Sequence, residues 1–267
     1  MKSTIQFNRI HASSVHRWLS CPQQMIYESL HADDSIREYR HVGAVVGDMV
    51  HAKVTGFNPQ EDPRPIMYDH QTRNMSEAKR QSKNIAAELI AYMDAKGIDI
   101  VAKEKVMAAR MRLGKSSLAV ELRGTADLLC MAINDDGHEE YVVLDIKTGT
   151  NMPENSMVQV AVYAYLISVQ DFYASSKNHF SRAGVLFGYR CKSKNISQRA
   201  NDGLKPPVYE TRPFDTMAEQ GKQMVMQAAR LASGSAQAFY NPSKVSCGRC
   251  ANKHCDFRFY TKEIANG

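Results

Sequence analysis

The sequence has no apolar run long enough to span a membrane, and its first ten residues, MKSTIQFNRI, contain no apolar signal region. It also has no internal repeat and no low-complexity tract. These absences argue against a helical membrane protein and a repeat array, and we expect a protein that stays in the cytoplasm.

Two further absences concern catalytic motifs. Gly114-Lys115-Ser116 is similar to the end of a phosphate-binding loop, but Ala109 stands where that motif requires a glycine. The His-Glu-x-x-His motif of zinc proteases does not occur. The sequence therefore offers no P-loop and no zinc-protease site.

The chain has an ordinary globular composition, with 43% apolar and 23% charged residues among 267. That length permits two domains, but it also suits one large α/β unit. We expect a single domain over 1–267: a helical part over about 1–100, a catalytic core over about 101–240 and a cysteine-rich tail over 241–267.

The net charge of +6 is modest, but basic residues are concentrated over 177–205, where seven stand against one acidic residue. Such a stretch attracts polyanions, although a solvated surface loop would have the same composition. Four of its residues are the candidates for nucleic-acid binding: Arg190, Lys192, Lys194 and Arg199.

Apolar spacing and turn residues predict a mixed order of helices and strands, without the regular alternation of a doubly wound sheet. Helices are expected over 13–18, 22–30, 42–55, 76–96, 153–172 and 217–232. Strands are expected over 101–113, 118–123, 126–133, 141–146 and 185–189. The predicted fold class is α/β, with a mixed central sheet flanked by helices.

Two carboxylates are the candidate metal ligands. Asp127 and Asp145 lie on strands joined by a short turn, so the two strands can pair in space. Phosphodiester hydrolysis needs a cation beside the phosphate and a water placed in line, and Mg²⁺ prefers carboxylate oxygens. Strand alternation puts Asp145 and Lys147 on one face, where the ammonium can orient or help deprotonate that water.

Two helices carry further candidates. His51, four residues after Gly47, can add a nitrogen ligand, which suits Mn²⁺ better than Mg²⁺. Gln159 and Tyr163 are four residues apart and share one helix face. Each pattern alone has a plainer interpretation: a surface ion pair, a half-buried histidine, an ordinary helix face. Their occurrence together in this order favours a catalytic site.

This ordered set resembles RecB-type nucleases of the PD-(D/E)XK superfamily, especially the CRISPR-associated and AddB-like branch. The resemblance runs from Ser13 to Cys255 and implies a restriction-endonuclease-like core that acts on DNA, with recombination or repair proteins as partners. It implies metal ligation by His51, Asp127, Asp145 and the Ile146 carbonyl, water activation by Lys147, and nucleic-acid positioning by Gln159 and Tyr163. Many members have a glutamate where this chain has Thr55.

The six cysteines of a cytoplasmic protein favour metal chemistry over disulfides. Cys247, Cys250 and Cys255 form a compact tail group, and Cys21 completes a set of four thiolates. Four thiolates bind Zn²⁺ or a [4Fe–4S] cluster equally well, and the spacing does not decide between them. The resemblance favours iron–sulfur and implies that the cluster joins the N- and C-terminal segments.

Together these observations predict a DNA exonuclease or end-processing nuclease that uses Mg²⁺ or Mn²⁺. The alternative is a non-catalytic nucleic-acid-binding module with a structural zinc cluster. Two carboxylates beside a polyanion disfavour this alternative, because binding alone does not need them.

Overall fold

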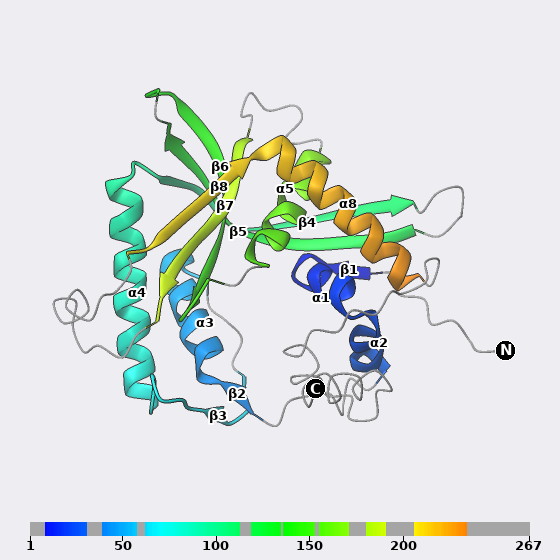
Figure 1. The fold of residues 1–267 in the computed structure, drawn as a ribbon. Coiled ribbons are helices and arrows are strands. Elements are labelled where there is room, and N and C mark those ends of the chain that lie inside the picture. The colour runs from blue at the N-terminus through cyan, green and yellow to red at the C-terminus, as the bar shows by residue number, and fades with distance from the viewer. Residues whose placement is uncertain are drawn as a thin grey trace, which may run out of the picture.

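The computed structural model describes residues 9–30, 39–57, 62–112, 119–134, 136–152, 155–170, 180–190 and 206–233. These residues form a central mixed sheet with helices on both faces (Figure 1). The architecture is consistent with a restriction-endonuclease-like fold, and it confirms the predicted α/β class.

The sheet has six strands in the order β1-β5-β6-β7-β8, and β4 pairs with the other edge of β5. The pairs β1–β5 and β6–β7 are parallel, and the remaining pairs are antiparallel. The strands are β1 (Arg9–His11), β4 (Asp99–Arg112), β5 (Ala119–Ile133), β6 (Glu139–Gly149), β7 (Phe180–Tyr189) and β8 (Val208–Pro213). A separate two-residue pair joins β2 (Arg40–His41) to β3 (Ile66–Met67).

The helices divide the apolar residues into two clusters, one on each face of the sheet. One face is covered by α3 (Val42–Thr55) and α4 (Met75–Ala95). The other is covered by α5 (Ser156–Ser168), α8 (Phe214–Ala232) and α1 (Val15–Ser20), which a single 3₁₀ turn (Ala12–Ser14) precedes and α2 (Pro22–Leu30) follows. Among the described residues, no helix has the length and apolarity needed to span a membrane.

β5 is the longest strand, and it changes partners along one edge. Its second half pairs with β6 from Leu128↔Leu144 to Ile133↔Glu139. Its first half pairs instead with β1, from Arg9↔Glu121 to His11↔Arg123. The strands β5 and β6 therefore separate beyond Leu128 and Leu144, and this fork is the structural basis of the candidate site.

The expected helices occur close to their predicted ends, including α3 over 42–55, which Gly56 ends with a φ of +78°. The strands expected over 118–123 and 126–133 are one continuous strand, because Gly124 stays paired with Met107. The separate pair β2–β3 was not predicted, and neither were the two short strands of the main sheet, β1 and β8. Neither has the continuous apolar run that marks a strand buried on both faces.

Candidate active site

The fork between β5 and β6 brings the two predicted carboxylates together. Asp127 and Asp145 each stand one residue beyond the last paired position, Leu128↔Leu144. The Ile146 backbone N–H donates to Asp127 Oδ2 at 2.8 Å. A side-chain hydrogen bond thus replaces the next backbone hydrogen bond between β5 and β6. The expectation that the two strand ends meet in space is therefore confirmed.

Asp145 is completely buried, and its environment is unusual for a carboxylate. The Lys147 ammonium lies 2.7 Å from Oδ2, while Oδ1 has no hydrogen-bond partner among the described residues. Burial raises the pKa of Asp145, and the neighbouring Lys147 opposes that rise. Ile146 packs in the apolar cluster on the other face of the sheet, beside α3 and α4, as the alternation of side chains along a strand predicted. A buried oxygen without a donor is what a cation ligand requires.

His51 approaches the fork from α3. Its Nε2 lies 3.1 Å from Asp127 Oδ1. Burial alone would lower the pKa of His51, but the carboxylate of Asp127 and its acidic neighbours outweigh burial and raise it. Gly47, one turn earlier, explains the spacing of the motif: a Cβ there would meet Thr148 Oγ1 at 3.1 Å. The missing side chain lets α3 lie close to β6 and brings His51 within reach of Asp127.

Glu104 of β4 also belongs to the site, although the sequence motifs did not indicate it. Its Oε1 lies 3.1 Å from His51 Nε2. Among the described residues, it is the only non-glycine with positive φ, at +50°. Burial raises the pKa of Glu104, and His51 opposes the rise. A non-glycine residue in this conformation is strained, and such strain is concentrated at functional sites.

Glu104 could have been found by counting the register of the β4–β5 pair. Lys105 pairs with Ala126 and Lys103 with Leu128, so Glu104 lies opposite Asp127. The Thr55 hydroxyl is also within hydrogen-bonding reach of the Glu104 carboxylate. An acidic side chain from β4 therefore lies beside Thr55, where many members of the resembling family have a glutamate on the helix.

On the other side of the fork, α5 holds the Lys147 ammonium. Lys147 Nζ donates to Gln159 Oε1 at 2.9 Å, and Gln159 Nε2 in turn contacts the hydroxyl of Tyr163. Burial raises the pKa of Tyr163 well above its usual value, and the charge of Asp145 adds to this. Gly124 makes the packing of α5 possible, because a Cβ there would lie 3.2 Å from the Tyr163 ring.

Three side chains offer ligand atoms that lie within 4.8 Å of one another: His51, Glu104 and Asp127. One imidazole and two carboxylates are a donor set that fits Mn²⁺ or Mg²⁺. The unpartnered Oδ1 of Asp145 lies across the fork from them. The residues present therefore fit a divalent cation.

The remaining predicted site residues lie elsewhere. Arg190 is 9% exposed, and its guanidinium bonds to Asp69 Oδ2 at 2.7 Å and to the Thr72 hydroxyl at 3.3 Å. Cys21 is half-buried at the end of α1. Six predicted residues lie outside the described ranges: Lys192, Lys194, Arg199, Cys247, Cys250 and Cys255.

Comparison with known proteins places this geometry in a family. A family model described as the PD-(D/E)XK nuclease superfamily matches residues 9–258. The chain belongs to the PD-(D/E)XK nuclease superfamily. Members of this superfamily are generally metal-dependent phosphodiesterases that act on nucleic acids. The grouped acidic side chains of the fork are therefore the residues expected to hold the divalent metal.

The other comparisons add little to this assignment. A solved structure titled "Crystal structure of SSO0001" is 14% identical to the chain, with a TM-score of 0.44. Its alignment covers 94% of this chain and 87% of the other, and we base no argument on similarity at that level. No curated protein matches the sequence.

Proposed function

We propose that the protein is a metal-dependent DNA exonuclease of the RecB-like branch. The observation that carries this proposal is the fork itself: Asp127, Asp145 and Lys147 converge where β5 and β6 separate. Neither a buried carboxylate with an unpartnered oxygen nor a strained Glu104 contributes to folding, so both features favour a catalytic site.

His51, Glu104, Asp127 and Asp145 would hold Mg²⁺ or Mn²⁺, together with the Ile146 carbonyl. A bound divalent cation neutralises the charge that develops on the phosphate oxygens. The Lys147 ammonium, which Gln159 and Asp145 fix from two sides, would orient the attacking water, and its positive charge would stabilise the hydroxide that remains when the proton of that water passes to solvent. Gln159 and Tyr163 position the substrate strand beside that ammonium.

Digestion of labelled DNA tests the proposal. Linear single-stranded, linear duplex and closed circular DNA are incubated with the protein in Mn²⁺, in Mg²⁺ and in excess EDTA. We expect cleavage of the linear DNA in either metal, no cleavage in EDTA and little cleavage of the circle. Efficient cutting of the circle would replace the exonuclease assignment with an endonuclease, and undiminished cutting in EDTA would rule out the metal mechanism.

The same assay separates this proposal from a non-catalytic binding module. A binding module would retain DNA on a filter but leave every substrate intact in both metals. The carboxylates of Glu104 and Asp127 disfavour that alternative, because negative charges beside the phosphates weaken binding and help only when a cation is present.

We also propose that Cys21, Cys247, Cys250 and Cys255 hold a [4Fe–4S] cluster, with Zn²⁺ as the alternative. Cys21 lies where α1 ends and α2 begins, and its backbone N–H bonds to the Arg17 carbonyl at 2.8 Å. A ligand at this junction would fix α1 and α2 to the C-terminal segment. Thiolate–metal bonds contribute on the order of 10 kcal/mol to small sites, so the cluster would serve stability.

Cys130 supplies the control for the cluster. It is fully buried, and burial raises the pKa of its thiol to about 12, so it stays protonated and does not bind metal. Cys21→Ala should reduce the iron content and the broad absorbance near about 400 nm as much as Cys250→Ala does. Cys130→Ala should leave both unchanged. Full occupancy in Cys21→Ala would overturn the four-thiolate site, and stoichiometric zinc in a colourless protein would overturn the iron.

A further inference from the structure

One face of the sheet has no helix over it among the described residues. This uncovered part consists of the first half of β5, the half of β4 that pairs with it, and the short β1. These segments extend beyond β6, β7 and β8 toward α8 (Figure 1). Alternate residues of these strands are buried against α5 and α8, and those between them point away. We name this surface the outer face; it comprises Arg9, His11, Val106, Ala108, Arg110, Arg112, Ala119, Glu121, Arg123 and Thr125.

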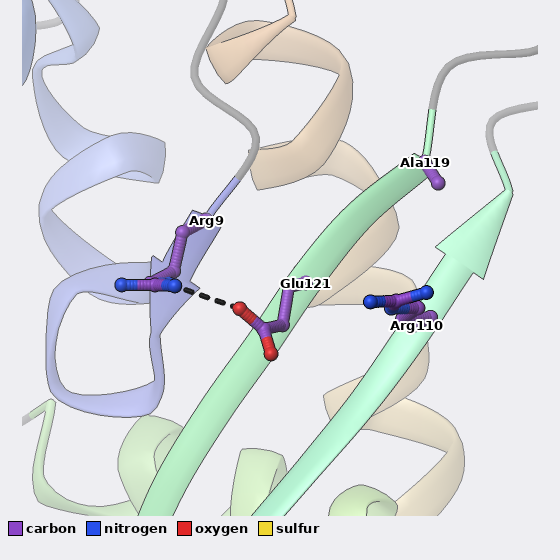
Figure 2. Close-up of a pocket in the computed structure, with 4 residues that line it drawn as sticks. All are labelled: Arg9, Arg110, Ala119 and Glu121. Carbon is purple, nitrogen blue, oxygen red and sulfur yellow. Dashed lines mark hydrogen bonds and ion pairs between the residues drawn. The ribbon is translucent and has the colours of Figure 1, made fainter.

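The outer face has an excess of positive charge. It has four arginines and one glutamate. Glu121 bonds to Arg9 at 2.9 Å and to Arg123 at 2.9 Å, so one carboxylate is shared between two guanidinium groups. Arg110 and Arg112 have no ion pair within the described part of the chain. Figure 2 shows Arg9, Glu121 and Arg110 side by side across the three strands.

The outer face leads directly to the catalytic fork. The pair Val106↔Thr125 is two residues from the opposed Glu104 and Asp127. A pocket of about 360 Å³ at this end is lined by Val106, Arg123, Gln159 and Tyr163, among others. A second pocket, of about 310 Å³, lies farther along the face between Arg9 and Arg110. Two separate hollows thus lie along the outer face, one beside Gln159, which holds Lys147, and one beside the exposed arginines.

We propose that the outer face binds the single DNA strand that enters or leaves the catalytic fork. The proposal rests on the proposed nuclease function and names where its substrate lies. The arginines would contact successive phosphates, as charge complementarity requires. Val106, which is 72% exposed, would contact a sugar or base next to the scissile phosphate.

The dimensions of the face favour one strand over a duplex. From Asp127 to Ala119, the β-strand rise gives a length of about 27 Å. The width is that of three paired strands, or about 10 Å between the outer two. This shape accommodates several consecutive nucleotides of one extended strand. The buried Arg190, already bonded to Asp69, offers no comparable surface.

Binding measurements with a matched pair of double variants test the proposal. Arg110→Gln with Arg112→Gln removes two exposed charges from the outer face. Lys79→Gln with Lys83→Gln removes two exposed charges from α4, which covers the other end of the sheet. Both proteins therefore have the same net charge. Affinity for fluorescent single-stranded oligonucleotides is measured in EDTA, over a range of salt concentrations and oligonucleotide lengths.

We expect the arginine variant to bind roughly tenfold more weakly and its salt slope to fall by about 0.7 for each phosphate that it no longer binds. Its affinity should also stop increasing with oligonucleotide length before that of the wild type does. The lysine variant should match the wild type in both respects. Equal decreases in affinity in the two variants would overturn the proposal, as would an affinity for duplex that falls more than that for the single strand.

The outcome is independent of whether the fork cleaves DNA, because binding in EDTA needs no catalysis. Loss of DNA affinity without any wild-type cleavage would leave the outer face standing and refute the nuclease. Normal cleavage by the wild type, together with unchanged DNA affinity in the arginine variant, would support the nuclease function and refute DNA binding by the outer face.

Discussion

The two halves of β5 have the same neighbour, β4, on one edge and contrasting environments everywhere else. The half from Leu128 to Ile133 pairs with β6 and is covered on both faces, so its residues are buried almost without interruption. The half from Ala119 to Thr125 pairs with β1 and alternates buried and accessible positions. The strand β5 is therefore covered on both faces at one end and on only one face at the other.

The two carboxylates that we propose to be catalytic, Asp127 and Asp145, lie at the boundary between these halves. Asp127 is 9% exposed and Asp145 is not exposed at all, although charged groups deep in a protein are costly. In the proposed nuclease, the substrate and the cation would approach this boundary from the side that no described helix covers, while the helices on the other side would limit the access of water. The candidate site therefore depends on the fork, where β5 changes its partner from β6 to β1, and not on either half of β5 alone.

The largest effect is expected at the fork. Asp145→Asn removes the charge of the buried carboxylate and keeps its shape, so DNA cleavage should fall by about a thousandfold. Binding of DNA in EDTA should remain near the wild-type value, because the outer face is intact. The comparison is between initial cleavage rates in Mn²⁺ and anisotropy in EDTA.

Lys147→Ala should lower cleavage similarly, and loss of binding in both variants would mean that the fork holds the DNA as well as cutting it. Substantial residual cleavage in both variants would contradict the catalytic assignment altogether.

Much of this boundary can be predicted from the sequence, and the reasons for the rest are physical. The continuous apolar run around Leu144 indicates a strand buried on both faces, and the polar Asp145 at its end indicates where burial stops. The order of His51, Asp127, Asp145 and Lys147 is also visible in the sequence. The strand buried on both faces is confirmed, and the four residues lie near one another at the fork, while their roles stay a prediction.

The features that were not predicted depend on contacts between distant segments. The strand β1 has three residues, of which only Ile10 is buried, and its pairing with Glu121 spans more than 100 residues of chain. Glu104 lies opposite Asp127 only because β4 and β5 keep one register from Arg112↔Ala119 to Ala102↔Leu129. Hydrophobic periodicity predicts neither the pairing of β1 with β5 nor the position of Glu104 opposite Asp127. The second can be predicted only by counting residue pairs along β4 and β5 from Arg112↔Ala119.

One substitution in each region compares the contribution to stability of the covered half of β5 with that of the outer face. Leu128 is fully buried, and Leu128→Ala should lower the free energy of unfolding by about 2–5 kcal/mol. Val106 is 72% exposed, and Val106→Ala should change that free energy by less than about 0.5 kcal/mol. Urea unfolding of both variants in EDTA gives the two values. Similar decreases would show that the outer half is covered in solution.

A smaller effect is expected for Glu104, which joins the two regions. Glu104→Gln removes one negative charge beside His51, so the Mn²⁺ concentration that gives half-maximal cleavage should rise roughly tenfold. Glu219→Gln is the matched control, because this exposed glutamate of α8 lies away from the fork. Direct titration of Mn²⁺ by calorimetry should give the same shift. An unchanged half-maximal concentration would remove Glu104 from the site.

The smallest effect tests the outer half by making its binding stronger. Arg123 and Arg9 hold the pKa of the Glu121 carboxyl below its usual value. The lowered pKa keeps Glu121 ionised down to a lower pH than an ordinary glutamate, and the small stabilisation from these pairs is lost only as the pH falls through the lowered value. Between roughly pH 5 and 8, Glu121 therefore stays charged and occupies both arginines.

Glu121→Gln removes that charge and leaves Arg9 and Arg123 available to phosphates. We expect affinity for single-stranded DNA to rise about threefold at neutral pH, with a steeper salt dependence than in the wild type. Thermal stability should change little, since exposed ion pairs contribute little. Glu139→Gln, at the opposite end of the sheet, is the control and should bind as the wild type does. Weaker binding in Glu121→Gln would mean that this carboxylate holds Arg9 and Arg123 in the positions that bind phosphate, rather than competing with phosphate for them.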